Sequence, residues 1–185
     1  MIEILLALDE KYFLLINQSG IDFLDPIMLF ITHKFSWIPF YALLVYLIFK
    51  LKGKEGFWIL LAITILITMA DQGSVQLFKN VFERLRPCHV LVEQVRLVTE
   101  RCGGQFGFVS SHASNAFALA IFLGKILENK KWFIGLFIWA ALVAYSRVYV
   151  GVHYPLDIIG GMLWGTFVAL VMFNMYQLFR EKIVR

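Results

Sequence analysis

Five apolar stretches follow one another from residue 35 onward, and they restrict the chain to a membrane fold. They cover about residues 35–51, 57–78, 112–127, 132–148 and 155–179. A helix of about 20 residues crosses the roughly 30 Å hydrocarbon core of a bilayer, so each stretch has close to the length of one span. Among the 185 residues, 60% are hydrophobic, which is more than an ordinary soluble domain contains. The sequence therefore predicts an all-α, polytopic membrane helix bundle of about five transmembrane helices.

The first 34 residues are predicted to lie along the membrane surface. Residues 1–17 carry apolar side chains at helical spacing, and a helix of this length reaches only about 25 Å, less than the hydrocarbon core. Residues 21–33 form a second short amphipathic piece. No basic leader or small-residue cleavage site stands at the N-terminus, so we expect no removable signal peptide. We expect one domain over residues 1–185, with interfacial helices over 1–34 and the transmembrane bundle and active site over 35–185.

The basic residues between the apolar stretches predict which way the bundle faces. Residues 50–54, residues 125–131 and the tail at 180–185 are basic, and all three fall on one side in a count of five spans. The positive-inside rule makes that side cytoplasmic. These loops also explain the net charge of +4, so we expect the lipid bilayer as a partner and no nucleic acid. The polar connections near the other ends of the spans then face outward.

Two cysteines, Cys88 and Cys102, lie in one of these outer connections. A disulfide persists outside the cytoplasm, so the sequence favours a bond between them over two free thiols.

The first of three polar clusters at the outer ends runs from Lys79 to Pro87. Lys79 and Arg86 are seven residues apart, or two helical turns, so both cations would point the same way before Pro87 breaks the helix. The alternative is that both only extend toward the membrane surface. Within the same span, polar side chains are expected to face the bundle interior. These are Asp71, Gln72, Ser74 and Gln76.

The second cluster, residues 107–112, opens the next span. Ser110 and Ser111 suit the start of a helix, where free N–H groups form an anion site. His112 is placed to serve as a general acid if it faces the same pocket as the third cluster. The alternative is ordinary capping with a histidine at the interface.

The third cluster, residues 146–157, lies at the junction of two apolar runs, where ionisable side chains are costly and usually functional. Pro155 suits the first turn of a helix, which places His153 at its mouth. Asp157 follows His153 by four residues, so the carboxylate can orient and polarise the imidazole if helical geometry reaches back that far. The planar donors of Arg147 suit a phosphate or a carboxylate. Alone, the histidine and the aspartate could be only a hydrogen-bonded pair.

Taken together, K-x6-R-P, the serine-histidine motif and S-R-x5-H-x3-D resemble the phosphatase signature of the type 2 phosphatidic acid phosphatase (PAP2) superfamily. The resemblance implies that His153 is a nucleophile that forms a phosphohistidine, that Asp157 orients it, and that His112 protonates the leaving group. It implies phosphate-binding roles for a further set of residues, with no metal and no other cofactor. That set is Lys79, Arg86, Ser110 and Arg147.

This sequence departs from the family pattern in two respects. Ser111 stands where the family has a glycine, and its hydroxyl would be an additional donor. The family commonly has six spans, whereas we count five, with the interfacial helices in place of the first. Arg96 and Arg101, in the connection between the first two clusters, could contact a second phosphate or a headgroup, or could be solvated loop charges.

The activity that the resemblance implies is metal-independent hydrolysis of a phosphate or pyrophosphate from a membrane lipid, at the periplasmic or exterior face of a bacterial inner membrane. Undecaprenyl pyrophosphate, lipid A 1-phosphate, phosphatidylglycerophosphate and phosphatidic acid all suit this geometry. Two alternatives are a phosphotransferase with the same phosphohistidine and a non-catalytic protein that binds or translocates lipid. The sequence leaves the lipid and the oligomeric state open.

Overall fold

The computed structural model describes residues 2–183, which fold into helices joined by turns and one long connection. The long helices are α3 (Ile38–Lys52), α4 (Gly56–Gly73), α7 (Ser111–Ile126), α8 (Lys130–Tyr149) and α9 (Pro155–Ile183). The other elements are α1 (Ile2–Gln18), α2 (Asp25–Thr32), η1 (Lys34–Trp37), η2 (Gly53–Glu55), η3 (Ser74–Lys79), α5 (Asn80–Phe82) and α6 (Pro87–Val90). The predicted domain also included Met1, Val184 and Arg185, which lie outside the described residues. The prediction of an all-α membrane bundle is confirmed.

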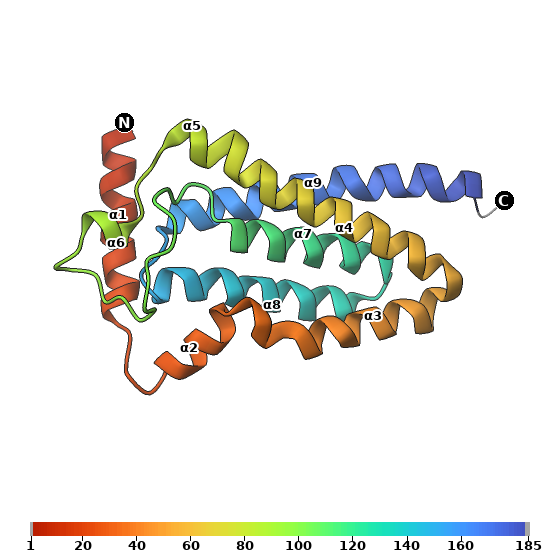
Figure 1. Cartoon of the computed structure of the whole chain (residues 1–185), viewed down its shortest axis with the longest axis horizontal. Helices are drawn as coiled ribbons and strands as arrows, with labels where there is room; N and C mark the ends of the chain where they lie inside the picture. Colours follow the sequence, from red (N-terminus) through yellow and green to blue (C-terminus); the bar gives the residue numbers. More distant parts are fainter. Residues whose placement is uncertain (1, 184–185) are drawn as a thin grey trace.

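The bundle is arranged around α7, which packs against α4, α8 and α9 (Figure 1). Most of its side chains are buried, and many of them are small, which lets neighbouring helices approach closely. Gly161 of α9 lies against the first turn of α7, where an added Cβ would come within 2.5 Å of the Ser110 carbonyl oxygen. Close packing of α9 on α7 therefore brings the second and third polar clusters together.

Three segments are long and apolar enough to cross a membrane by length and composition, at residues 34–82, 130–149 and 155–182. The first segment folds back on itself, because α3 and α4 meet at η2 and run in opposite directions (Figure 1). Helix α7 has 16 residues, fewer than the roughly 20 that a full span needs. The count of five spans therefore stays a prediction.

The turns at residues 53–55 and 127–129 and the C-terminal end of α9 lie at one end of the bundle (Figure 1). The long connection 83–110 and the turn 150–154 lie at the opposite end, together with α1 and α6. The basic loops and the three polar clusters thus lie at opposite ends of the bundle.

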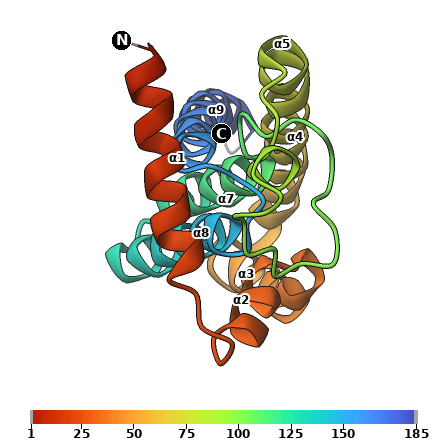
Figure 2. The same ribbon diagram turned by 90° about the vertical axis from the view of Figure 1, so that its left-hand side faces the viewer.

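Helix α1 runs across the ends of the bundle helices rather than along them (Figures 1 and 2). Asp9, Phe13 and Asn17 are its buried residues, and their spacing of four places them on one face. Asn17 donates to the carbonyl oxygens of Tyr149 and Arg96 at 2.8 and 2.9 Å. Most other apolar side chains of α1 are exposed, as on a helix that rests on a bilayer.

The first polar cluster differs from the sequence prediction. Helix α4 continues through the π-helical turn η3 into α5, which ends at Phe82, and Glu83 adopts a left-handed conformation with φ of 47°. Arg86 is therefore not on the helix of Lys79, and the prediction of two cations two turns apart was wrong. Arg86 instead lies in an extended segment whose backbone pairs with residues 105–107, because its N–H donates to the Gln105 carbonyl at 3.2 Å.

Two other predictions, one in α4 and one in η3, were wrong. Gln72 and Gln76 are exposed, whereas Ser74 is buried and Asp71 is partly buried. The change of helical period in η3 alters which side of the helix faces inward. Asp71 accepts from Asn115 of α7 at 3.1 Å and so connects two helices.

The long connection 83–110 is held to the bundle end by covalent and ionic contacts. Cys88 and Cys102 form a disulfide with a Cα separation of 5.8 Å. Arg96 donates to Asp22 and Asp25, and its guanidinium lies over the ring of Tyr149. Arg96 is therefore not a free solvated charge, because it ties the connection to Asp22 and to Asp25 at the start of α2. Arg101 is exposed.

Candidate active site

His153 and Asp157 form a buried pair at the start of α9. His153 lies in the turn before the helix, and its Nδ1 is 3.1 Å from Oδ2 of Asp157. The same oxygen accepts from the backbone N–H of Tyr154 at 3.1 Å, as the third residue of a helix does in a capping box. His153 is 1% exposed and Asp157 is fully buried. Because the carboxylate accepts from Nδ1–H, the lone pair of the neutral ring is on Nε2.

The surroundings of His153 keep its ring neutral. Burial lowers the pKa of His153 well below its ordinary value, and the nearby charges of Arg86, Arg147 and Lys79 lower it further. A histidine with a lowered pKa keeps its lone pair at neutral pH and below. This ring has the protonation state that a nucleophile needs.

Three cations from different parts of the chain lie close enough to the histidine for their charges to lower its pKa. Lys79 donates to the Ser111 hydroxyl at 2.8 Å, Arg86 donates to the Phe106 carbonyl at 3.2 Å, and Arg147 donates to the Thr32 hydroxyl at 2.6 Å. None of the three forms an ion pair with a carboxylate among residues 2–183. The buried Nε of Arg147 has no hydrogen-bond partner within the same range. Cations without counter-charges in a buried place are the arrangement of an anion site.

The start of α7 completes this pocket. Ser110 is the N-cap of α7, and its hydroxyl accepts from the Ala113 N–H at 3.5 Å. The backbone N–H of Ser110 donates to the backbone carbonyl of Asp157 at 2.9 Å. Ser111 bonds to both Lys79 and Ser74, at 2.8 and 2.6 Å. His112 lies close enough to His153 and to the three cations to interact with their charges. All eight catalytic and phosphate-binding residues named from the sequence therefore gather at one end of the bundle.

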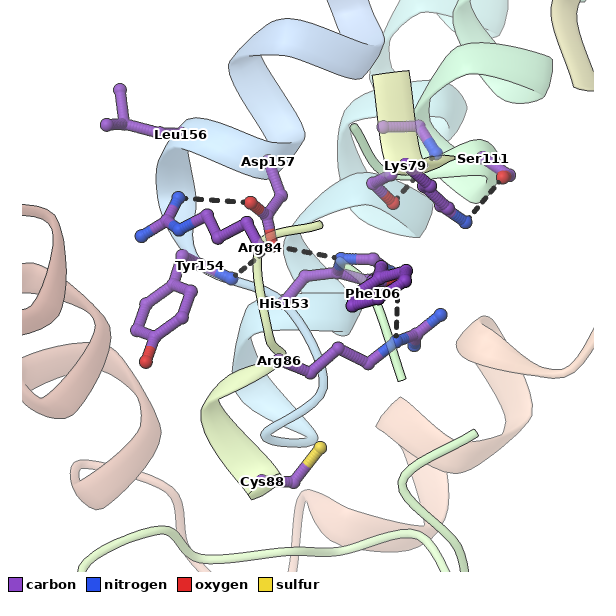
Figure 3. A network of polar contacts seen from close by, with 12 residues as sticks. Lys79, Arg84, Arg86, Cys88, Phe106, Ser111, His153, Tyr154, Leu156 and Asp157 are labelled. Atoms are coloured by element: carbon purple, nitrogen blue, oxygen red, sulfur yellow. Dashed lines mark hydrogen bonds and ion pairs between the residues drawn. The ribbon is translucent and has the colours of Figure 1, made fainter. Parts of the chain in front are cut away.

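Sequence reasoning missed two charged residues of the site. Arg84 donates to Oδ1 of Asp157 at 3.1 Å (Figure 3). It also donates to Oδ2 of Asp9 at 2.6 Å. In the sequence, the one feature that could have pointed to Arg84 is its position two residues before Arg86. Asp9 comes from α1, and nothing in its local sequence connects it with residues near position 157.

Gly107 is a third residue whose place in the site the sequence did not reveal. A Cβ at this position would lie 2.7 Å from Oδ2 of Asp157 and 3.3 Å from Cγ of Arg86. Only glycine lets the backbone of the connection pass this close to the carboxylate.

An apolar cavity of about 500 Å³ opens from the same end into the bundle. Ser111, His112 and Thr32 line it beside the cations, and Leu119, Ile48 and Leu123 line it deeper between α3, α4, α7 and α8. Ligand sites commonly combine such an apolar space with a few polar groups at one end. A molecule with an anionic head and a hydrocarbon chain matches this combination.

The arrangement as a whole suits phosphoryl transfer to a histidine. A neutral imidazole lies beside fixed cations that can stabilise the charge on a phosphoryl group, and a second histidine is close by. In the described part of the chain, no group of three or more His, Cys, Asp or Glu side chains is placed to hold a metal ion.

Comparison with known proteins agrees with this geometry. A 38% identical relative, covering 90% of this chain and 76% of its own length, is a lipid A 4'-phosphatase of Bacteroides thetaiotaomicron. A 33% identical relative, covering 90% of this chain and 77% of its own length, is an undecaprenyl-diphosphatase of Sulfolobus acidocaldarius. The crystal structure of a transmembrane PAP2-type phosphatidylglycerolphosphate phosphatase from Bacillus subtilis superposes with a TM-score of 0.71. That structure is 26% identical and covers 97% of this chain and 87% of its own.

The sequence model described as the PAP2 superfamily matches residues 56–181, which include all three polar clusters. Since this match covers well over half of the chain, the protein belongs to the PAP2 superfamily.

Proposed function

We propose that this protein hydrolyses a phosphate monoester or pyrophosphate on a membrane lipid, with His153 as the nucleophile. The observation that carries the proposal is the buried His153–Asp157 pair beside three cations that form no ion pair within residues 2–183. An apolar cavity reaches Ser111 and His112 at the same end of the bundle. The cations would hold the phosphoryl oxygens, and the cavity would hold the hydrocarbon chain. The named activities of the relatives support a lipid phosphate or pyrophosphate as the substrate class.

The reaction has two steps. Nε2 of His153 attacks phosphorus, the bond from phosphorus to the leaving oxygen breaks, and His112 gives that oxygen its proton. Water then attacks the phosphohistidine, His112 takes a proton from the water, and Nε2 departs with the electron pair of the broken P–N bond. Lys79, Arg86 and Arg147 stabilise the charge on the phosphoryl oxygens in both steps, while Asp157 holds the ring through Nδ1.

The site would face the periplasm or the exterior of a bacterial inner membrane. This orientation follows from the basic loops, which lie at the opposite end of the bundle and mark the cytoplasmic side. Residues 1–34 would lie along the outer surface of the same domain, because α1 crosses the bundle end and exposes apolar side chains. The disulfide of the outer connection agrees with a location outside the cytoplasm.

Among the lipids that suit the site, the 38% identical relative supports a phosphorylated acyl lipid of the lipid A type, at the 4'-phosphate rather than the 1-phosphate. The undecaprenyl-diphosphatase relative supports polyprenyl pyrophosphate as the second candidate.

The test is phosphate release by the purified protein in detergent, from lipid A, undecaprenyl pyrophosphate, phosphatidylglycerophosphate and phosphatidic acid. We expect release from at least one lipid, its abolition by His153→Ala, and normal release by His89→Ala, which removes an exposed histidine of α6. A folded wild-type protein that releases no phosphate from any of these lipids would contradict the proposed function.

A further inference from the structure

Helix α1 reaches the catalytic carboxylate through a chain of two charged side chains. Asp9 of α1 accepts from Arg84 at 2.6 Å, and Arg84 donates through its other nitrogen to Oδ1 of Asp157 at 3.1 Å. Asp9 also accepts from the backbone N–H of Leu156 at 2.8 Å, in the first turn of α9. Figure 3 shows Arg84 on the side of Asp157 away from Lys79 and from the guanidinium of Arg86.

These contacts divide the two oxygens of Asp157 between different tasks. Oδ2 serves His153 and the N–H of Tyr154, whereas Oδ1 has Arg84 as its partner. A fully buried carboxylate needs a paired cation to remain charged, and Arg84 is the one cation that forms an ion pair with it within residues 2–183. The rotation of the carboxylate, and with it the orientation of the imidazole, is therefore set from the side opposite the phosphate pocket.

Arg84 is itself held on two sides. Its guanidinium lies over the ring of Tyr154 at 4.2 Å, and that ring packs edge to face against Phe13 of α1 at 5.2 Å. The side chain of Asp9 is 1% exposed, so its carboxylate is committed to Arg84 and Leu156 rather than to water. An asparagine at position 9 would have one acceptor oxygen and could serve only one of these two donors.

We propose that Asp9 and Arg84 are positioning residues for the reaction, which makes α1 a working part of the active site. They act through Asp157 and do not touch the phosphoryl group. This inference rests on the proposed function only for its kinetic consequences, because the orientation of His153 is measurable without turnover.

The kinetic test compares Asp9→Asn, Arg84→Gln and Arg84→Lys with Glu3→Gln, which removes an exposed carboxylate from the same helix. A misplaced catalytic group costs up to about 100-fold in rate, so we expect kcat to fall about 10-fold for Asp9→Asn and about 100-fold for Arg84→Gln. KM should stay within about twofold, since the phosphate pocket is intact. Arg84→Lys should recover part of the loss, and Glu3→Gln should behave as the wild type.

The second test follows the His153 ring directly by ¹⁵N NMR of the histidine side chains, with His153→Ala to assign the signal. We expect a neutral ring with the proton on Nδ1 in the wild type and in Glu3→Gln, and a mixture of tautomers in Asp9→Asn and Arg84→Gln. Unchanged tautomers together with unchanged kcat in both variants would overturn the inference, as would a loss expressed in KM alone.

The two tests separate the two claims. A wild-type protein without lipid phosphatase activity whose His153 tautomer still responds to Asp9→Asn would contradict the proposed function and leave the positioning role standing. Full activity in Asp9→Asn and Arg84→Gln, with His153→Ala inactive, would contradict the positioning role alone.

Discussion

Asp157 illustrates how far residue spacing predicts this site. The four-residue interval between His153 and Asp157 correctly indicated a contact, although α9 does not extend back to His153. The contact depends instead on the hydrogen bond from the Tyr154 N–H to the Asp157 carboxylate, which points this carboxylate toward the residues just before α9. The partner of the other oxygen, Arg84, could not be inferred from spacing, because 73 residues separate it from Asp157.

The lowered pKa of His153 predicts the acid side of the pH profile. The ring must be neutral to attack, and burial and the neighbouring cations lower its pKa, so kcat/KM should fall only well below the ordinary histidine pKa of about 6.5. Arg86→Gln removes one of the cations that lower this pKa, so the acid limb should move to higher pH. A profile flat over the whole range, with chemistry limiting, would contradict these assignments.

Ser111 replaces a glycine of the family pattern, and the structure gives its hydroxyl a partner. This hydroxyl accepts from Lys79 at 2.8 Å, so Ser111→Ala should leave the Lys79 ammonium less firmly positioned. Loss of one such hydrogen bond costs about 1 kcal/mol, so kcat/KM should fall about fivefold. Ser19→Ala, at an exposed serine that bonds only within its own turn, is the matched control and should leave kcat/KM unchanged. Equal values for Ser111→Ala and the wild type would remove Ser111 from the site.

At the scale of secondary-structure elements, α1 was predictable as a helix but not as part of the site. Its length and apolar spacing indicated an interfacial helix, whereas its docking face consists of Asp9, Phe13 and Asn17, whose partners lie in the connection 83–110 and around α9. Such long-range contacts leave no periodic pattern in a single sequence. The π-helical turn η3, which contains the exposed Gln76, was equally hidden.

Phe13 tests how firmly α1 is docked. Its side chain is fully buried against Tyr154, and truncation of a buried phenylalanine costs about 3–5 kcal/mol. Phe13→Ala should therefore lower the thermal unfolding midpoint of the detergent-solubilised protein by several degrees and lower kcat as well. Leu15 of the same helix is 65% exposed, so Leu15→Ala should leave both quantities unchanged. Equal midpoints for the two variants would show that α1 is not docked as described.

For the whole molecule, the sequence predicted an all-α membrane bundle with its polar clusters at one end, because apolar length and basic loops are additive properties of the chain. The cavity between α3, α4, α7 and α8 was not predictable in the same way. A cavity depends on how side chains of several helices fail to fill the space between them, which only the packed structure reveals.

The cavity makes a prediction about substrate length. Leu119 lines it in the middle of α7, and Leu119→Trp would fill part of the space for a hydrocarbon chain. The KM for a long-chain lipid phosphate should rise about tenfold, in line with an overpacking cost of about 1–3 kcal/mol, while that for a short-chain phosphate ester stays nearly unchanged. Leu163→Trp, at a 61% exposed position of α9, is the control. Equal changes in KM for long-chain and short-chain substrates would show that the hydrocarbon chain of the lipid does not bind in this cavity.

The most direct measurement is the transfer of labelled phosphate from the lipid to the protein, quenched within one turnover and carried out in EDTA. We expect an acid-labile, alkali-stable label that maps to His153, that is absent in His153→Ala, and that forms without any divalent ion. Release of phosphate by His153→Ala at the wild-type rate, a label on another residue, or activity that requires a restored metal ion would contradict the mechanism.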